Sequence, residues 1–462
     1  MIQPLQEISP PTRRLSAYIA DALAHPLPEA VAEKARHHVL DTLASMVSGA
    51  SLHPGRLAVD YIGTLGGIRE SSVVGTRLRT SAVNAALANG MLAHADETDD
   101  SHAPSRNHPG CAVVPAALAI AERTGASGER FLRAVALGYD VAARVNYGLD
   151  ADAFAAASRS THSFGGTFGA GAAAGSLLGF DAQEARHLLS LCAQQASGVG
   201  CNVRDSDHVE KAFDFGGMPA RNGVTAATMV AAGFTGVDDV FSGERNFLEA
   251  YSPNPNADLL GDQLGERFEI LGTNIKKWSV GSPAQSALDA MTYLFENEGL
   301  EGGQIASIRV HLPTRSARTV DNAPMPDINV QHLLAMLVTD GKLTFRSIHD
   351  RARMEDQKIR ALRKNISLVP SEELMQARPR RQAIVEVTTH DGRTLSRRTV
   401  AVRGTADNPM IREEVEAKAL DLLADALGVR RARALVRAIR GLSGVADVTD
   451  LRRLWQPAPS AR

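Results

Sequence analysis

The feature that most constrains this fold is a change in the spacing of apolar residues near residue 265. Upstream of it, Pro28 precedes a segment in which Val31, Ala35, Val39 and Leu43 recur at helical spacing. Four further segments rich in Ala and Leu have the same character: 81–97, 115–148, 181–200 and 222–236. Residues 12 to about 265 are therefore predicted to be mostly helical.

Downstream of this point the pattern becomes that of strands. Ile308, Val310 and Leu312 alternate with polar residues, which predicts a strand with one buried face. Two β-rich runs in 383–404 meet at Asp391 and Gly392, a strong hairpin signal. Helical segments are predicted at 282–299, 329–341 and 411–442.

These patterns predict a mainly α protein with two domains. Residues 1–267 and 405–462 would form a large all-helical domain, and 268–404 a smaller α+β domain inserted into it. A chain of 462 residues is too long for one ordinary core, which agrees with two domains.

The composition limits the classes of partner. With 44% apolar and 22% charged residues the chain is typical of a globular protein, and its formal charge of -2 gives no electrostatic case for nucleic acid or a membrane surface. Its three cysteines form no CxxC pair, as expected of reduced thiols. No signal peptide and no apolar run of about 20 residues is recognised. We therefore expect a cytoplasmic protein.

The stretch "HADETDDSHAPSRNHPGC", residues 94–111, concentrates histidines and acids. It lacks the H-x-x-x-H, H-E-x-x-H and calcium-loop spacings of common metal sites, so no metal is predicted. Proton transfer fits better, because imidazole titrates near neutral pH and a neighbouring carboxylate raises its basicity. His108 precedes Pro109 in extended chain, where its ring can face a cleft. A structural role for these histidines stays open.

Two further passages carry chemistry. Gly169, Gly171 and Gly175 lack the preceding strand of a dinucleotide fingerprint, so they indicate close helix packing and no nicotinamide cofactor. Several cations and histidines follow in sequence, and their convergence on one cleft would indicate a small polyanionic substrate: His162, His208, Lys211, Arg221, Lys276 and Lys277. Taken singly, His208 and Lys277 are expected to be solvated.

The motifs "LANGMLAHADETDDSH", "HPGCAVVPAALAIAE", "THSFGGTFGAGAAAGSLLG" and "EKAFDFGGMPARNGVTAA" resemble those of the MmgE/PrpD family. Its members include 2-methylcitrate dehydratase, cis-aconitate decarboxylase and iminodisuccinate epimerase. The resemblance implies a helical domain with an α+β lid, a homodimer, and a site between the domains that acts on di- or tricarboxylates without metal or organic cofactor.

The resemblance also assigns roles to residues, with some departures. The family's H-x-x-D-x-D-D-T stretch corresponds to His94, Glu97, Asp99, Asp100 and Ser101, so Glu97 replaces the catalytic aspartate and Ser101 the threonine. His108, His162, Lys211 and Lys276 match the family's pattern. Other positions differ, because the family usually has proline, cysteine, histidine and tyrosine where this chain has Ser279, Val280, Gln285 and His332.

The resulting hypothesis is a cofactor-independent lyase, more a hydro-lyase than a decarboxylase, that removes a proton next to a carboxylate. The expected catalytic residues are His108, His162, Lys211, Lys276, Glu97 and Ser101. The expected substrate-binding residues are Arg221, His332, Asp100 and Lys277. An epimerase that uses two bases, and a non-catalytic binding protein on the same fold, are the alternatives.

Overall fold

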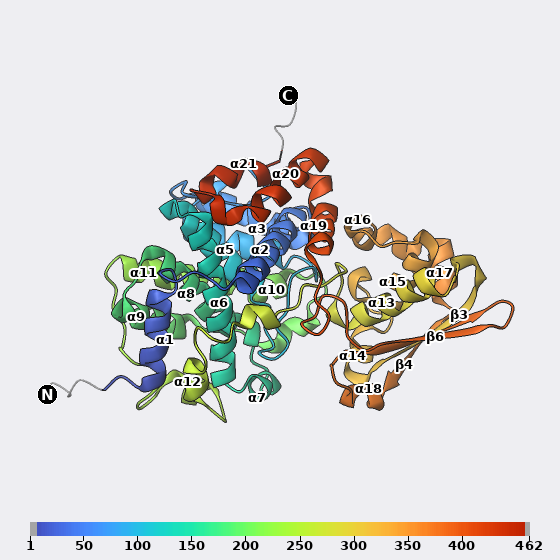
Figure 1. Ribbon diagram of the computed structural model, residues 1–462, viewed down its shortest axis with the longest axis horizontal. Helices are drawn as coiled ribbons and strands as arrows, with labels where there is room; N and C mark the ends of the chain where they lie inside the picture. The colour runs from blue at the N-terminus through green and yellow to red at the C-terminus, as the bar shows by residue number, and fades with distance from the viewer. Residues whose placement is uncertain (1–6, 458–462) are drawn as a thin grey trace. The chain divides into compact units, whose positions relative to one another are not determined.

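The computed structural model describes residues 7–457, which divide into two compact units. Unit 1 contains the chain up to residue 95, residues 99–273 and the chain from residue 422. Unit 2 contains residues 274–421 together with the short segment 96–98. Figure 1 shows the helices and strands of each unit along the chain.

Unit 1 is helical apart from one two-stranded ribbon. Its longer helices are α1 (Pro10–Asp21), α2 (Glu29–Gly49), α3 (His53–Leu65), α4 (Ala82–Ala93), α5 (Gly110–Thr124), α6 (Gly128–Gly148), α8 (Thr161–Leu178), α9 (Ala182–Gln195), α11 (Met218–Ala231) and α20 (Val429–Arg440). Its shorter elements are β1 (Ser71–Ser72), β2 (Arg79–Thr80), α7 (Ala151–Ala156), η1 (Gly200–Arg204), α10 (Val209–Ala212), η2 (Phe213–Gly217), α12 (Phe247–Tyr251), η3 (Ala257–Gly261), η4 (Glu269–Gly272), η8 (Leu442–Gly444), η9 (Val448–Leu451) and α21 (Arg452–Trp455). Helix α19 (Arg412–Leu427) crosses from unit 2 into unit 1.

Helix α8 is the centre of unit 1 and packs against α5, α6, α9 and α11. A Cβ atom on Gly169 would lie 2.4 Å from the carbonyl oxygen of Gly138 on α6, and one on Gly223 of α11 would lie 2.4 Å from the backbone nitrogen of Gly171. Only glycine permits such close approach of two helix backbones. The helix-packing interpretation of the glycines in 169–175 is confirmed.

Unit 2 combines a four-stranded sheet with helices. The strand order is β4-β3-β5-β6, where β3 (Ile305–Pro313) runs parallel to β4 (Ile366–Ser371) and antiparallel to β5 (Ala383–Thr389), and β5 runs antiparallel to β6 (Thr394–Thr399). The remaining elements are α13 (Ser282–Asn297), η5 (Gly302–Gln304), α14 (Thr314–Val320), η6 (Pro326–Ile328), α15 (Val330–Asp340), α16 (Phe345–His349), η7 (Arg351–Glu355), α17 (Gln357–Arg363) and α18 (Glu372–Gln376). Ile308, Val310 and Leu312 of β3 join α13 and α15 in one apolar core.

The mainly α prediction is confirmed, since the structure is 61% helical and 8% strand. The predicted strand around Ile308 is β3, and Asp391 and Gly392 lie in the turn between β5 and β6. The division between the units falls at 273/274 and at 421/422, whereas the sequence placed it near 267 and 404. Within residues 7–457, no helix is both long and apolar enough to cross a membrane.

Candidate active site

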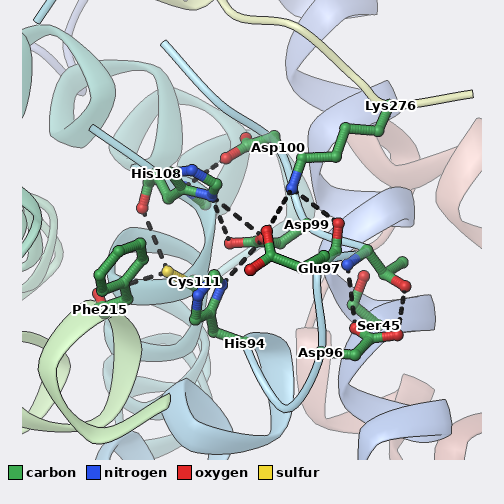
Figure 2. Close-up of polar contacts among 12 residues, drawn as sticks. Ser45, His94, Asp96, Glu97, Asp99, Asp100, His108, Cys111, Phe215 and Lys276 are labelled. Carbon is green, nitrogen blue, oxygen red and sulfur yellow. Dashed lines mark hydrogen bonds and ion pairs between the residues drawn. The ribbon is translucent and has the colours of Figure 1, made fainter. Parts of the chain in front are cut away.

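Three imidazoles gather around one phenyl ring in unit 1. His94 caps the C-terminus of α4, His108 lies just before α5, and His162 lies in the first turn of α8. The ring centroids are 5.3 Å apart for His94 and His108, and 5.1 Å apart for His108 and His162. Phe215 stacks on His162 at 3.6 Å and on His94 at 4.5 Å. Figure 2 shows His94, His108 and Phe215 around a common centre.

The phenyl ring is held there by a π-helical turn, η2, in the sequence "FDFGG". A Cβ atom on Gly90 of α4 would lie 2.3 Å from the carbonyl oxygen of Gly216, and one on Gly216 would lie 2.1 Å from that of Gly90. This backbone contact brings η2 against the last turn of α4, next to His94. Widened turns of this kind are frequent at functional sites.

Asp99 lies close to two of the imidazoles. Its Oδ1 lies 3.0 Å from Nδ1 of His94 and 3.1 Å from Nδ1 of His108, and all three side chains converge in Figure 2. An ionised carboxylate only accepts hydrogen bonds, so His108 carries its proton on Nδ1 and has Nε2 available as a base. Asp99 is fully buried at 0% exposure, which keeps this contact away from solvent.

The acidity of His162 is strongly perturbed. Burial lowers the pKa of His162 well below its usual value, and Coulombic interactions with His108, His94 and Lys211 lower it further. The Nζ of Lys211 lies 5.2 Å from the centroid of the Phe215 ring. His162 is therefore uncharged at neutral pH and can accept a proton, with a cation close by.

His208 is buried at 5% exposure, so the expectation that it is solvated was wrong. Its ring lies 5.1 Å from that of His94, and its backbone is left-handed, with φ at 65°, directly before α10 begins. Asp214, which precedes Phe215 in η2, accepts hydrogen bonds from Ser160 at 2.5 Å and Asn202 at 2.7 Å. Burial raises the pKa of Asp214 to about 6.

Asp100, expected to bind substrate, lies in a buried hydrogen-bond network. It accepts from the Tyr139 hydroxyl at 2.5 Å and from the backbone N–H of Gly110 at 3.0 Å, and its Oδ2 lies 2.7 Å from Nδ1 of His38. Burial opposes its charge, but the hydrogen bond with His38 holds the pKa of Asp100 below its usual range. The network fixes the start of α5, immediately after His108. Ser101, which follows directly, is also buried.

Three cations of unit 2 bind the segment 96–98. His349 Nε2 lies 2.9 Å from Asp96 Oδ2, Lys276 Nζ donates to the backbone carbonyl of Glu97 at 2.7 Å, and Lys418 Nζ donates to that of Thr98 at 2.9 Å. The Glu97 carboxylate lies 3.7 Å from the same Lys276 Nζ. Figure 2 shows the two side chains side by side. Glu97 and Lys276, two of the expected catalytic residues, are therefore neighbours within this unit.

The expected binding residues have varied surroundings. The Arg221 guanidinium bonds the side-chain oxygen of Asn222 and lies 5.8 Å from the Phe213 ring. Lys277 lies 4.8 Å from the Trp278 ring and lines two pockets of unit 2, of about 240 and 350 Å³. His332 is buried in α15, where burial lowers its pKa to about 4.

The residues at 279–285 that differ from the expected pattern have a structural role. Gln285 donates from Nε2 to the carbonyls of Trp278 at 2.8 Å and Val280 at 2.9 Å, and accepts from the backbone N–H of Trp278 at 3.1 Å. The glutamine therefore fixes the loop that follows Lys276 and Lys277. Ser279 and Val280 are both buried in that loop.

Sequence reasoning missed several residues of the site. Phe215 lies within the quoted passage "EKAFDFGG", yet nothing in the spacing indicates that its ring joins three imidazoles. His349 lies about 250 residues from Asp96 in sequence, and no local signal connects them. Among groups with metal-binding donors, His94, Asp99 and Cys111 lie together in unit 1.

Comparison with known families gives two matches. The model of the MmgE/PrpD N-terminal domain matches residues 13–260, and that of the MmgE/PrpD C-terminal domain matches residues 278–442. A comparison with curated proteins found no significant match. The two family matches together cover most of the chain.

Proposed function

The chain belongs to the MmgE/PrpD family, which includes dehydratases and related enzymes, and from this premise we propose that it is a lyase acting on a small di- or tricarboxylate. The proposed reaction is a dehydration, begun by removing a proton from the carbon next to a carboxylate. The observation that carries the proposal is the contact of His108 with Asp99 at 3.1 Å, beside the uncharged His162 and the cation of Lys211.

The proposed base is His108 or His162. An imidazole whose Nδ1–H faces a carboxylate has a more basic Nε2, which suits abstraction of a weakly acidic C–H proton. The electron pair of the broken C–H bond moves onto the substrate carboxylate as an enediolate. When this collapses to an alkene, the hydroxyl on the neighbouring carbon leaves and takes the proton that the base has gained, giving water and restoring the neutral imidazole.

Cations are needed because the enediolate carries extra negative charge. Preorganised donors in a site that excludes water stabilise such charge by several kcal/mol, and loss of one donor typically costs about 10²–10³ in rate. Lys211 is the candidate beside the imidazoles, and Lys276 is the candidate in unit 2. Glu97 would orient Lys276, and Ser101 would bind a carboxylate oxygen. Arg221, Lys277, His332 and Asp100 stay weaker candidates for substrate contacts.

An epimerase is the second candidate, favoured by the 5.1 Å separation of the His108 and His162 rings. Two bases on opposite faces of one carbon would exchange a proton without any change of mass. A non-catalytic binding protein is the third candidate, and it predicts ligand stabilisation without hydrogen exchange.

Proton NMR in D2O, on chelator-treated protein, tests all three. The panel is citrate, 2-methylcitrate, cis-aconitate, malate, tartrate and iminodisuccinate. Loss of a C–H signal with a new alkene signal supports the lyase, whereas deuterium incorporation into a substrate or its stereoisomer, with no alkene signal, supports the epimerase. Activity that appears only after metal is added would contradict the proposed independence from cofactors.

The same premise favours a cytoplasmic homodimer with a small-molecule substrate as its only other partner. The formal charge of -2 agrees with the absence of a nucleic-acid or membrane partner. Light scattering at several concentrations tests the dimer, and a monomer mass throughout would contradict it.

A further inference from the structure

Three unlike donor atoms meet in unit 1 beside the proposed base. They are a ring nitrogen of His94, a carboxylate oxygen of Asp99 and the thiol sulfur of Cys111, and all three lie within 4.8 Å of one another. The residues come from the end of α4, the loop after it and the first turn of α5. Their exposures are all 0%, and Figure 2 shows the three side chains together.

The His94 ring points into this group with its hydrogen-bonding capacity unused. Its Nδ1 lies 3.0 Å from Asp99 Oδ1, yet among the residues that the structure describes neither ring nitrogen of His94 makes a hydrogen bond of acceptable geometry. A buried imidazole normally has at least one aligned partner, because an unsatisfied polar group costs about 1–3 kcal/mol. Stacking on Phe215 at 4.5 Å holds the ring in place. Its nitrogens are therefore positioned without a well-aligned hydrogen bond among the residues that the structure describes.

The thiol is held at the same place. Cys111 Sγ donates toward the carbonyl of His108 at 3.2 Å and that of Phe215 at 3.4 Å. These contacts hold the sulfur in place near the two other donors, and the proton-transfer steps proposed above do not use Cys111.

We propose that His94, Asp99 and Cys111 form a binding site for a thiophilic divalent cation of the zinc type, and that its occupation inhibits the enzyme by drawing Asp99 away from His108. Nitrogen, thiolate and carboxylate are the ligands that zinc takes in proteins, with a water in the fourth position. A hard cation such as magnesium disfavours sulfur and nitrogen, so it would not compete. The binding site stands on geometry, whereas the inhibition rests on the proposed function.

The binding step is a ligand exchange without oxidation or reduction. The S–H bond of Cys111 breaks and its proton goes to solvent, while the sulfur forms a bond to the metal. His94 binds through the lone pair of one ring nitrogen and keeps its proton on the other. Asp99 gives an oxygen to the metal, so its hydrogen bond from Nδ1 of His108 becomes weaker. Nε2 of His108 is then a weaker base.

The test uses cobalt as a coloured zinc substitute on full-length, chelator-treated protein. Wild type should bind one equivalent and show a thiolate-to-cobalt charge-transfer band. The Cys111→Ser variant should lose the band and bind zinc at least about tenfold more weakly, although serine can still donate to both carbonyls. Cys192→Ser is the matched control, because Cys192 is another buried thiol, and it donates to the Thr167 carbonyl at 3.7 Å.

The optical result decides the site without any substrate. The proposed metal site is overturned by any of three results. These are no band in wild type, an unchanged band in Cys111→Ser, or a band that disappears in Cys201→Ser instead. Inhibition is read separately, as deuterium exchange in the proton NMR assay. Zinc should slow wild type and Cys192→Ser at least about tenfold while sparing Cys111→Ser. Full activity of zinc-saturated wild type would overturn the inhibition alone, and a metal-free protein without any exchange would count against the proposed function alone.

Discussion

The imidazole of His349 lies 2.9 Å from the carboxylate of Asp96, and both side chains are largely buried within unit 2. Burial alone would lower the pKa of His349, but the hydrogen bond and charge of Asp96 raise it to about 9, and the charge of Asp327 adds to this. Burial raises the pKa of Asp327 itself to about 6. One buried histidinium therefore offsets the charge of Asp96 and interacts with Asp327.

This pair predicts a pH dependence of stability. A histidine whose folded pKa exceeds its ordinary 6.5 contributes stability fully below pH 6.5, and the contribution disappears as the pH rises through about 9. The free energy of unfolding in urea should therefore fall by up to about 3 kcal/mol more between pH 6.5 and 9.5 in wild type than in His349→Gln. His25→Gln, at an exposed histidine, is the control and should follow wild type. Parallel curves for His349→Gln and wild type would contradict the pairing.

Replacement of His108 should abolish turnover and leave the fold intact. His108→Gln removes the base that contacts Asp99, and general-base catalysis typically contributes about 10²–10⁴ in kcat. The measurement is the rate of deuterium exchange into whichever substrate of the panel reacts, with circular dichroism to check folding. His37→Gln, on the partly exposed face of α2, should keep full activity. Full activity in His108→Gln would remove His108 from the mechanism.

Lys211 should affect both rate and acidity. Lys211→Met removes a cation from the site, which should lower kcat/KM by about 10²–10³. Since the charge of Lys211 is one cause of the lowered pKa of His162, that pKa should rise in the variant. An NMR titration of the imidazole C–H signals measures the change. The exposed Lys364→Met is the control. A lowered rate with an unchanged pKa of His162 would mean that Lys211 acts away from these imidazoles.

A single methyl group at the contact between α4 and η2 should disturb the site. Gly90→Ala would place a Cβ 2.3 Å from the Gly216 carbonyl, so α4 and η2 must separate at an expected cost of about 1–3 kcal/mol. The displacement of Phe215 should reduce activity as well. Gly63→Ala, on α3 with nothing within 4 Å of the added atom, should be neutral or stabilise by about 0.5–1 kcal/mol. Equal thermal midpoints for the two variants would show that the α4–η2 contact is not tight.

The elements that sequence reasoning found are those with a local signal. Alternation around Ile308 and the Asp391–Gly392 turn specify a strand and a hairpin from neighbours alone. Strand β4 was missed because "ISLVPS" is short, contains a proline and pairs with β3 from more than 50 residues away. Edge strands tolerate proline, so the residue does not exclude a strand there.

The residues of the site likewise divide into those with a local sequence signal and those without one. Family motifs indicated His108, His162 and Lys211, and the structure brings these residues around Phe215. The role of Phe215, the burial of His208 and the ion pair of His349 depend on tertiary contacts, which no spacing along the chain encodes. The spacing of 94–111 argued against a metal because its histidines do not share a helix face. A thiol from the next helix completes the donor group instead.

The segment 96–98 has a consequence for how the chain can be divided. Residues 274–421 are contiguous and contain the whole four-stranded sheet, so they look like a module that could be expressed alone or exchanged between relatives. Such a fragment would lack the carboxylate and the two carbonyls that His349, Lys276 and Lys418 bind. Any chimera made at these boundaries would combine the cations of one parent with the loop of another. Recombination would preserve this part of the molecule only by carrying two distant pieces of sequence together.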